Sequence, residues 1–356
     1  MLKSLFHAWE RRLASVTTDR VVRPFEWGLD WIPRNGDRAG AGDAEILGAW
    51  ISAVMSDTDA FFTPPAISDY RVADAEEGTS LLTFPSAFTT PHPENNTVYC
   101  RYFPARGANE LQPAPVADRP VPSQPGAAVL VLPQWNADAS GHVGLCRLLN
   151  WGGMSALRLA LPYHDQRMPP ELHRADYIVS ANIARTVQVC RQAVLDARRA
   201  VHWLAGQGYE RIGILGTSLG SCLALLTTSH EPLIRAQALN HISPYFADVV
   251  WRGLSTEHVR DGLNGHVELD LLRALWKPIS PRWYLERLRD RRTLLVYARY
   301  DLTFPVDLSE DLVREFRELD IPHEVSVLRC GHYSSGLAPF KFVDGWVLTR
   351  FLKQAL

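Results

Sequence analysis

The feature that most constrains the fold is an alternation of short apolar runs with amphipathic stretches, from about residue 80 to the C-terminus. The run AAVLVL at 127–132 has no polar interruption, which is typical of a strand covered on both faces. Further strand-like runs follow at 156–161, 211–215, 236–242, 293–298 and 324–328. Strand and helix signals that alternate in this way predict an α/β fold, with a mostly parallel central sheet and helices on both faces.

The stretches between these runs have the periodicity of helices. Over 183–204, apolar residues recur at steps of three and four, so they lie on one helix face. The same pattern predicts a helix over about 308–319 and a closing helix around 343–351. Each of these helices is expected to pack its apolar face against the sheet.

The chain divides into two regions in this interpretation. Residues 1–79 form a partly helical N-terminal extension, and residues 80–356 form the main domain, which starts with strands over 80–87 and 97–103. The stretch 246–287 breaks the alternation with aromatic, helix-like runs and is predicted to be an inserted cap. The prolines within 113–125 predict a surface loop.

Composition excludes several classes of protein. The chain has 37 Lys and Arg against 39 Asp and Glu, a net charge of −2, which weighs against a nucleic-acid binder. Its five cysteines are odd in number and form no CxxC pair, so we expect no disulfide framework or zinc ribbon and a reducing compartment, the cytoplasm. The first residues lack the apolar core of a signal peptide, and no run approaches the ~18 apolar residues of a membrane-spanning helix. No membrane partner is therefore expected.

The sharpest chemical signal is the motif GTSLG at 216–220. It follows the strand-like run 211–215 and opens an apolar stretch that can form a helix, so Ser218 is predicted to lie on a tight strand-to-helix turn. Such a turn needs small residues two positions before and after the serine, and Gly216 and Gly220 provide them. The alternative is an ordinary glycine-rich turn with an idle serine.

A serine hydroxyl needs a base, and the base needs an acceptor that orients it. Among twelve histidines, His332 stands out because it follows the run 324–328 in a loop that contains a glycine. Asp301 closes the strand-like run TLLVYARYD and is the expected acceptor, with Asp307 and Asp248 as rivals. The chain order Ser218, Asp301, His332 is the order expected of one particular fold.

On these residues, the sequence resembles the α/β-hydrolase superfamily over about residues 80–356. The turn LPYHDQR at 161–167 is also similar to one that many esterases of the superfamily carry, and the general pattern resembles the dienelactone-hydrolase-like and acyl-peptidase-like branches. Dienelactone hydrolases proper use a cysteine nucleophile, and this chain has serine. The resemblance implies an oxyanion hole made by the backbone N–H of Leu219 and that of Trp135, with Gln134 as the alternative. Many members have His-Gly where this chain has Pro-Gln.

Other residues allow two interpretations each. His164, Asp165 and His173 could be imagined as a metal site, but turn residues that pin the loop after the strand at 156–161 are the better interpretation. Cys222 more simply packs inward as a small apolar residue than acts as a thiol. The aromatic residues Trp251, Trp276 and Trp283 either line an acyl pocket or pack within the cap.

The sequence therefore predicts a serine hydrolase, most simply a carboxylesterase. It would cleave small to medium acyl esters of small molecules through Ser218, His332, Asp301 and an acyl-enzyme, with no cofactor or metal. Amide, thioester or peptide hydrolysis on the same fold, a lyase that uses the same triad, and a non-catalytic binding protein are the alternatives. The sequence leaves self-association and the role of residues 1–79 open.

Overall fold

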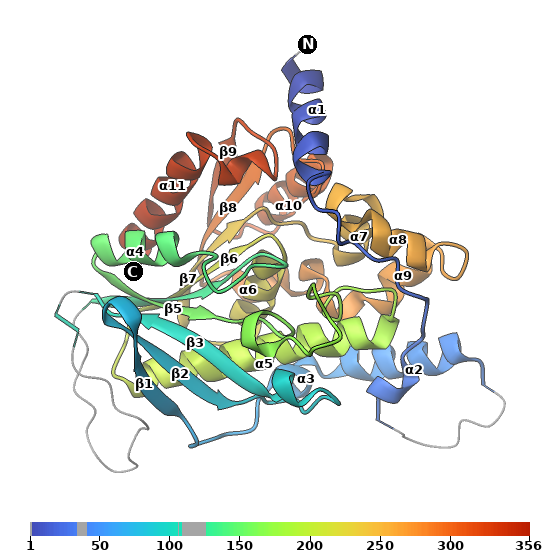
Figure 1. Ribbon diagram of the computed structural model, residues 1–356, viewed down its shortest axis with the longest axis horizontal. Coiled ribbons are helices and arrows are strands. Elements are labelled where there is room, and N and C mark those ends of the chain that lie inside the picture. The colour runs from blue at the N-terminus through green and yellow to red at the C-terminus, as the bar shows by residue number, and fades with distance from the viewer. Residues whose placement is uncertain (1, 34–40, 106, 109–125) are drawn as a thin grey trace.

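The computed structural model describes residues 2–33, 41–105, 107–108 and 126–356. Its strands are β1 (Arg71–Ala75), β2 (Thr79–Pro85), β3 (Thr97–Phe103), β4 (Ala127–Leu132), β5 (Met154–Leu159), β6 (Ile212–Thr217), β7 (Ile234–Asn240), β8 (Arg292–Ala298) and β9 (His323–Leu328). They form one sheet in the order β1-β2-β3-β5-β4-β6-β7-β8-β9. Helices lie on both sides of this sheet (Figure 1), so the predicted α/β class is confirmed.

The sheet has an antiparallel part and a parallel part. Strands β1, β2, β3 and β5 pair antiparallel in succession, and β5, β4, β6, β7, β8 and β9 pair parallel. Because the carboxyl ends of parallel strands meet at one edge of a sheet, the loops after β4, β6, β7, β8 and β9 lie together. The predicted site residues follow these strands.

The helices form two layers. They are α1 (Leu2–Ala14), α2 (Asp43–Ser56), α3 (Thr58–Phe62), α4 (Val143–Trp151), α5 (Ile183–Gly206), α6 (Leu219–His230), α7 (Phe246–Arg252), α8 (Glu257–Leu263), α9 (Leu269–Leu275), α10 (Val306–Glu318) and α11 (Phe340–Ala355). Side chains of β4 alternate between the two layers: Leu130 and Leu132 belong to the core with α5 and α6, and Val129 and Val131 to the core with α4 and α11. All residues of β4 are buried, as its unbroken apolar sequence predicts.

The sheet and the helices can be compared with the regions expected from the sequence. Strand β1 already pairs with β2, so the sheet begins before residue 80 and the first hairpin spans the boundary suggested at 79/80. The cap stretch 246–287 contains α7, α8 and α9, between β7 and β8. The proline-rich stretch 113–125 lies outside the described residues. None of the helices in the described ranges is long and apolar enough to cross a lipid bilayer.

Candidate active site

Ser218 lies at the sharp bend between β6 and α6. Its backbone has φ 56° and ψ −120°, a region that a residue with a side chain rarely adopts. Its N–H donates to the carbonyl of Asn240 at 2.8 Å, which holds the bend against β7. A Cβ on Gly216 would lie 2.1 Å from the carbonyl oxygen of Gly220, and one on Gly220 2.3 Å from that of Leu132. Both glycines are therefore required by the close approach of backbone, and the bend holds the serine in a strained conformation.

His332 lies in the loop after β9 and faces the serine. Its Nε2 is 3.1 Å from the Ser218 Oγ, and its Nδ1 is 2.9 Å from the Oδ2 of Asp301. The ring of Phe304 stacks on the imidazole with an interplanar angle of 2° and centroids 5.4 Å apart. The imidazole therefore bridges the hydroxyl and the carboxylate, with its plane fixed by an aromatic neighbour.

Asp301 follows β8 and is buried, and every lone-pair direction of its carboxylate is used. The Oδ1 accepts the backbone N–H groups of Thr303 and Phe304, both at 2.8 Å. The Oδ2 accepts from His332 and also from His241, whose Nδ1 is 3.0 Å away. Burial opposes ionisation of Asp301, but the two imidazoles outweigh it and lower the pKa of the carboxyl group. The side chain is therefore a carboxylate at neutral pH.

The two rival aspartates lie elsewhere. Asp307 pairs with Arg252 at 2.8 Å on the surface. Asp248 is buried and forms a bidentate pair with Arg273, 2.6 Å and 2.9 Å from its two oxygens. Neither contacts His332 in the described part of the chain, so the structure brings Asp301 alone of the three to the imidazole.

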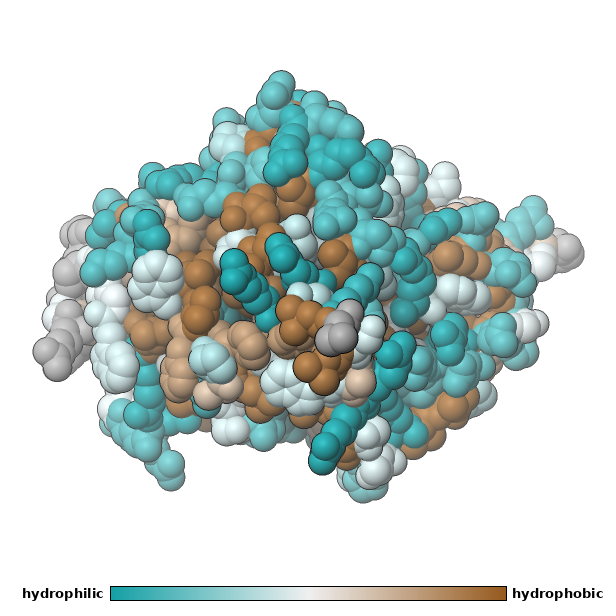
Figure 2. Space-filling model, turned by 90° about the horizontal axis from the view of Figure 1, so that it is seen from above, coloured by the Kyte–Doolittle hydropathy of each residue, from teal (hydrophilic) through white to brown (hydrophobic). Residues whose placement is uncertain are grey.

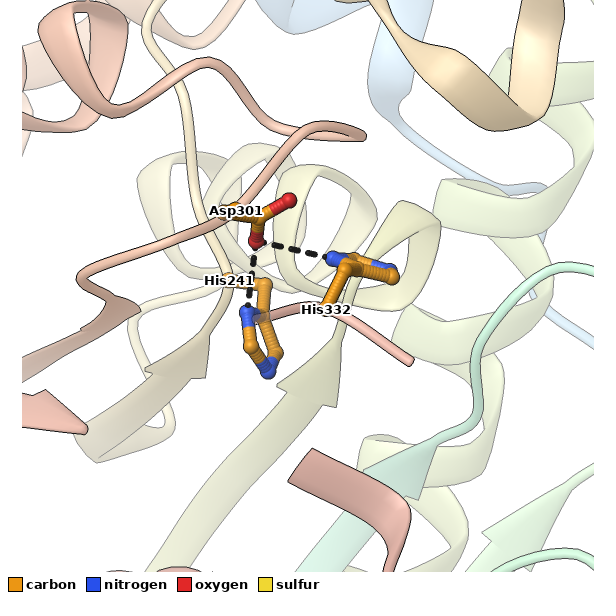
Figure 3. Close-up of side chains that lie close together, drawn as sticks. All are labelled: His241, Asp301 and His332. Carbon is orange, nitrogen blue, oxygen red and sulfur yellow. Dashed lines mark hydrogen bonds and ion pairs between the residues drawn. The ribbon is translucent and has the colours of Figure 1, made fainter. Parts of the chain in front are cut away.

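His241 is a site residue that sequence reasoning missed. It follows β7 directly, and Figure 3 shows both imidazoles pointing at the same oxygen of Asp301. Its Nε2 lies 3.2 Å from the Ser335 Oγ. Burial disfavours its charged form, but Asp301 more than compensates, so the pKa of His241 is raised. Its position at the carboxyl end of a strand could have marked it as a candidate site residue. Only the sheet order, however, shows that β7 lies beside β8, which Asp301 follows.

The same three side chains have the donor atoms of a metal site. Nitrogen and oxygen atoms of His241, Asp301 and His332 lie within 4.8 Å of one another, close enough to share an ion. The Nδ1 atoms of both histidines are hydrogen-bonded to the Oδ2 of Asp301 (Figure 3). A serine hydroxyl in contact with an imidazole that a carboxylate orients is the arrangement that moves a proton from serine to histidine, while the carboxylate stays ionised.

The loop after β4 lies beside the serine. Register pairs Leu132 with Gly216, so Gln134 and Trp135 follow next to the bend. Within the described residues, no hydrogen-bond acceptor contacts the backbone N–H of either residue. The N–H of Leu219, at the start of α6, belongs to the helix N-terminus, where such groups have no partner inside the helix. The N–H groups of Gln134, Trp135 and Leu219 are therefore the candidate donors of an oxyanion hole.

His164 pins this loop. Its Nε2 accepts the backbone N–H of Asn136 at 2.9 Å, and its Nδ1 donates to the carbonyl of Pro162 at 2.9 Å. Burial lowers the pKa of His164 to about 4, which keeps the ring neutral and able to accept. Asp165 pairs with Arg158, and His173 is exposed, so the imagined metal ligands are not assembled.

Two cavities meet at the serine. The smaller has a volume of about 40 Å³, and its apolar lining includes Phe246, Val249 and Val250 of the stretch 246–287 together with Leu219 and Cys222. The larger, of about 820 Å³, is lined by His332 and extends between α4 and α11. Burial raises the pKa of the Cys222 thiol to about 12, so it serves as an apolar wall.

The tryptophans Trp251, Trp276 and Trp283 line neither of these cavities. Trp276 is buried and donates to the carbonyl of Ile183, which ties the cap to α5, and Trp283 is exposed beneath Lys277. Trp251 is partly buried and packs against the hydrophobic core.

Comparison with known proteins identifies the fold. No family model matches this chain, and no curated protein matches its sequence. Among solved structures, it is similar to an acetyl xylan esterase from Paenibacillus sp. R4, with a TM-score of 0.60 and 15% identity over 92% of this chain and 98% of that one. An acetyl xylan esterase from a Thermoanaerobacterium species gives a TM-score of 0.55 and 13% identity over 96% and 98%.

A Pyrococcus horikoshii acylaminoacyl peptidase gives a TM-score of 0.57 and 12% identity. That match covers 82% of this chain, which spans only 42% of the peptidase. The chain thus has the α/β-hydrolase fold, as the sequence resemblance implied.

Proposed function

We propose that this protein is a serine hydrolase that cleaves carboxylic esters of small to medium acyl groups through an acyl-enzyme. The observation that carries the proposal is the 3.1 Å contact between the Ser218 Oγ and the His332 Nε2, at a strained bend above the parallel strands. The carboxylate of Asp301 on the opposite ring nitrogen completes a Ser-His-Asp triad.

In the first half of the reaction, the Ser218 Oγ attacks the ester carbonyl carbon while the His332 Nε2 takes the hydroxyl proton. The C–O bond to the alcohol then breaks, and the imidazolium gives its proton to the departing oxygen. Asp301 keeps the ring in the tautomer that has hydrogen on Nδ1. In the second half, water attacks the carbonyl carbon of the acyl-enzyme while His332 takes a proton from the water. The bond between this carbon and the Ser218 Oγ then breaks, the carboxylic acid leaves, and the imidazolium gives its proton to the Oγ.

The negative charge of each tetrahedral intermediate needs fixed donors. The N–H of Leu219 and that of Trp135 are the proposed pair, with Gln134 as the alternative second donor. Trp135 is favoured because it lines both cavities that meet at the serine, whereas Gln134 lines only the larger one. Removing one such donor in related chemistry typically costs ~3 kcal/mol of barrier.

The test is labelling with a fluorophosphonate together with turnover of nitrophenyl esters. We expect the probe to attach to Ser218, and we expect Ser218→Ala to lower kcat by several orders of magnitude. Ser229→Ala is the matched control, because that buried hydroxyl bonds only to the Leu225 carbonyl of the same helix in the described chain. Equal turnover by the Ser218→Ala variant and the control would contradict the proposal.

The bond that is cleaved is tested separately. Among matched ester, thioester and aminoacyl-amide substrates, we expect the ester to be hydrolysed fastest. A preference for the amide would instead assign a peptidase activity to the same triad, like that in the name of the Pyrococcus protein. Turnover of a substrate without probe labelling of Ser218 would point to lyase chemistry.

A further inference from the structure

The two cavities at Ser218 differ in what lines them, and this difference assigns their roles. His332 lines the larger cavity alone and Leu219 the smaller one alone, whereas Trp135 lines both. The proposed reaction requires His332 to protonate the leaving alcohol, so the alcohol must lie on the side of the larger cavity. The acyl chain occupies the remaining direction at the tetrahedral carbon, and the smaller cavity opens there.

The smaller cavity limits the length of the acyl chain. At 10–15 Å³ for each water-sized group, about 40 Å³ accommodates roughly three such groups beyond the serine. Its walls are the side chains of Phe246, Val249 and Val250 from the cap, all buried, together with Phe304. Because these residues also belong to the continuous hydrophobic core, a longer chain would have to displace packed side chains.

The larger cavity accommodates a bulky partner. Close to the triad it is lined by polar groups such as Arg20, Asn136 and His142, and away from it by Trp151 and Trp346. These two tryptophans are 84% and 57% exposed, which leaves aromatic surface at the outer end. Figure 2 shows apolar and polar residues interspersed over the middle of the molecule as seen from above.

We propose, on the basis of the function proposed above, that the substrates are esters of short acids, with two to four acyl carbons, and of bulky alcohols with an aromatic or other apolar portion. The acid enters the cavity beneath the cap, and the alcohol lies between α4 and α11.

The experiment measures kcat/KM for nitrophenyl acetate, butyrate, hexanoate and octanoate. We expect a fall of at least 10-fold between butyrate and hexanoate, since one misfitting methylene can cost 10-fold or more. Phenyl acetate and 4-phenylphenyl acetate then compare alcohols of different size and similar acidity, and the larger should be the better substrate. A kcat/KM that stays constant or rises with acyl length would overturn the assignment of the acyl group to the smaller cavity. A higher kcat/KM for the smaller alcohol would overturn the assignment of the alcohol to the larger cavity.

A pair of variants localises the effect. Val250→Ala enlarges the smaller cavity and should raise the hexanoate-to-acetate ratio at least 10-fold. Val259→Ala makes the same change in the cap at a residue outside both cavities and should leave the ratio unchanged. If the wild type hydrolyses long chains best and Ser218 is still labelled, the triad stands and this inference fails. If no ester is turned over and Ser218 is not labelled, the proposed function itself fails.

A second, independent observation concerns the N-terminal helix. Glu10 on α1 is 0% exposed, and its carboxylate accepts the backbone N–H groups of Tyr333 and Ser334, at 2.7 Å and 3.0 Å. These are the two residues directly after His332. A Cβ on Gly331 would lie 2.2 Å from the Glu10 Cδ, so the glycine before the histidine makes room for the carboxylate.

The same N-terminal segment reaches both sides of the triad. Phe6 stacks on Tyr300, the residue before Asp301, with centroids 4.4 Å apart. Arg20 donates to the Tyr333 hydroxyl at 2.9 Å. In the described part of the chain, Glu10 has no ion-pair partner, and the backbone N–H groups of Tyr333 and Ser334 are the donors to its carboxylate. Helix α1 stands beside the loop after β9 (Figure 1).

We infer that Glu10 is a positioning residue that fixes the His332 loop at the distance from Ser218 that proton transfer needs. In Glu10→Gln, one oxygen becomes an NH₂ group that faces an N–H, so one of the two hydrogen bonds is lost. Small misplacements of a catalytic group can cost up to about 100-fold in rate. We therefore expect kcat to fall 10- to 100-fold with KM changed less than 2-fold, and labelling of Ser218 by the fluorophosphonate to slow in proportion.

The control must separate positioning from stability. Leu47→Ala, in the core of α2 and away from the triad, lowers the melting temperature without touching the loop. Both variants are assayed well below their melting temperatures. An unchanged kcat in Glu10→Gln, or an equal loss in Leu47→Ala, overturns the inference. If Glu10→Gln does not fold, Tyr333→Phe removes the contact with Arg20, and an unchanged kcat there counts against the role of this segment.

Discussion

Replacing His241 by asparagine should move the acidic limb of the pH profile of kcat/KM to higher pH. The hydroxyl of Ser335 donates its single proton to the carbonyl of His332 at 2.7 Å, so it can only accept from the His241 Nε2. The His241 Nδ1 donates to the carboxylate of Asp301. Both contacts suit a ring with hydrogen on both nitrogens, and the raised pKa of His241 favours this imidazolium form, which is buried beside the proposed base.

The groups around His241 set the size of the effect. The carboxylates of Asp301, Asp344 and Glu10 all favour its charge. The other group that can become positive is His332, whose ring centroid is 4.5 Å from that of His241. Two unit charges at this distance repel by about 4 kcal/mol at an effective dielectric constant of about 20. At ~1.4 kcal/mol for each pH unit, the repulsion is equivalent to two to three pH units, roughly.

Asparagine is the appropriate replacement. It tolerates the positive φ of 57° at this position better than most residues, and its amide can donate to Asp301 without a charge. Without the positive charge at position 241, adding a proton to the active site costs less free energy, so the acidic limb of the profile should lie at a higher pH. Activity between about pH 5 and 7 should therefore fall, while the plateau at alkaline pH is retained.

The assay is kcat/KM for a short nitrophenyl ester from pH 4.5 to 9, with His230→Asn as the control. His230 is a buried histidine that bonds to the Leu226 carbonyl in α6. Coincident acidic limbs for wild type and folded His241→Asn would refute the reasoning. A second measurement is the free energy of unfolding as a function of pH, because the raised pKa of His241 makes stability depend on pH. The stability that its charge contributes is complete below its ordinary pKa of 6.5 and disappears as pH rises through the folded-state pKa.

Three further predictions follow from contacts of single residues. Asp301→Asn should lower kcat by three to four orders of magnitude, roughly, because His332 loses its orientation, with circular dichroism to check the fold. Arg167→Met breaks a pair with Asp196 in which both side chains are 0% exposed, so urea unfolding should show a loss of about 3–5 kcal/mol. Its kcat, measured where the variant is folded, should stay near that of the wild type. Gly331→Ala places a methyl group against Glu10 and should lower the melting temperature, and it should lower kcat at least 10-fold. An unchanged kcat would contradict the view that the Glu10 carboxylate needs a glycine at position 331.

Much of the fold could be predicted from local sequence because its core strands are covered on both faces. The run 127–132 coincides with β4, and the helical periodicity from 183 coincides with α5. Ser218 was recognisable because a strand, a glycine two positions either side and an apolar helix stand next to one another in the chain. These are local signals, and the strained φ of the serine is their direct consequence.

What only the tertiary structure decided is which distant side chains meet. The sequence placed an aspartate and a histidine after strands, but the lateral order of β7, β8 and β9 brings a second imidazole, His241, to the same carboxylate. The carboxylate of Glu10 lies against residues more than 320 positions later in the chain. Hydrophobic periodicity reports which face of an element is buried and contains no information about its neighbours, because nonlocal contacts depend on how the packed layers assemble.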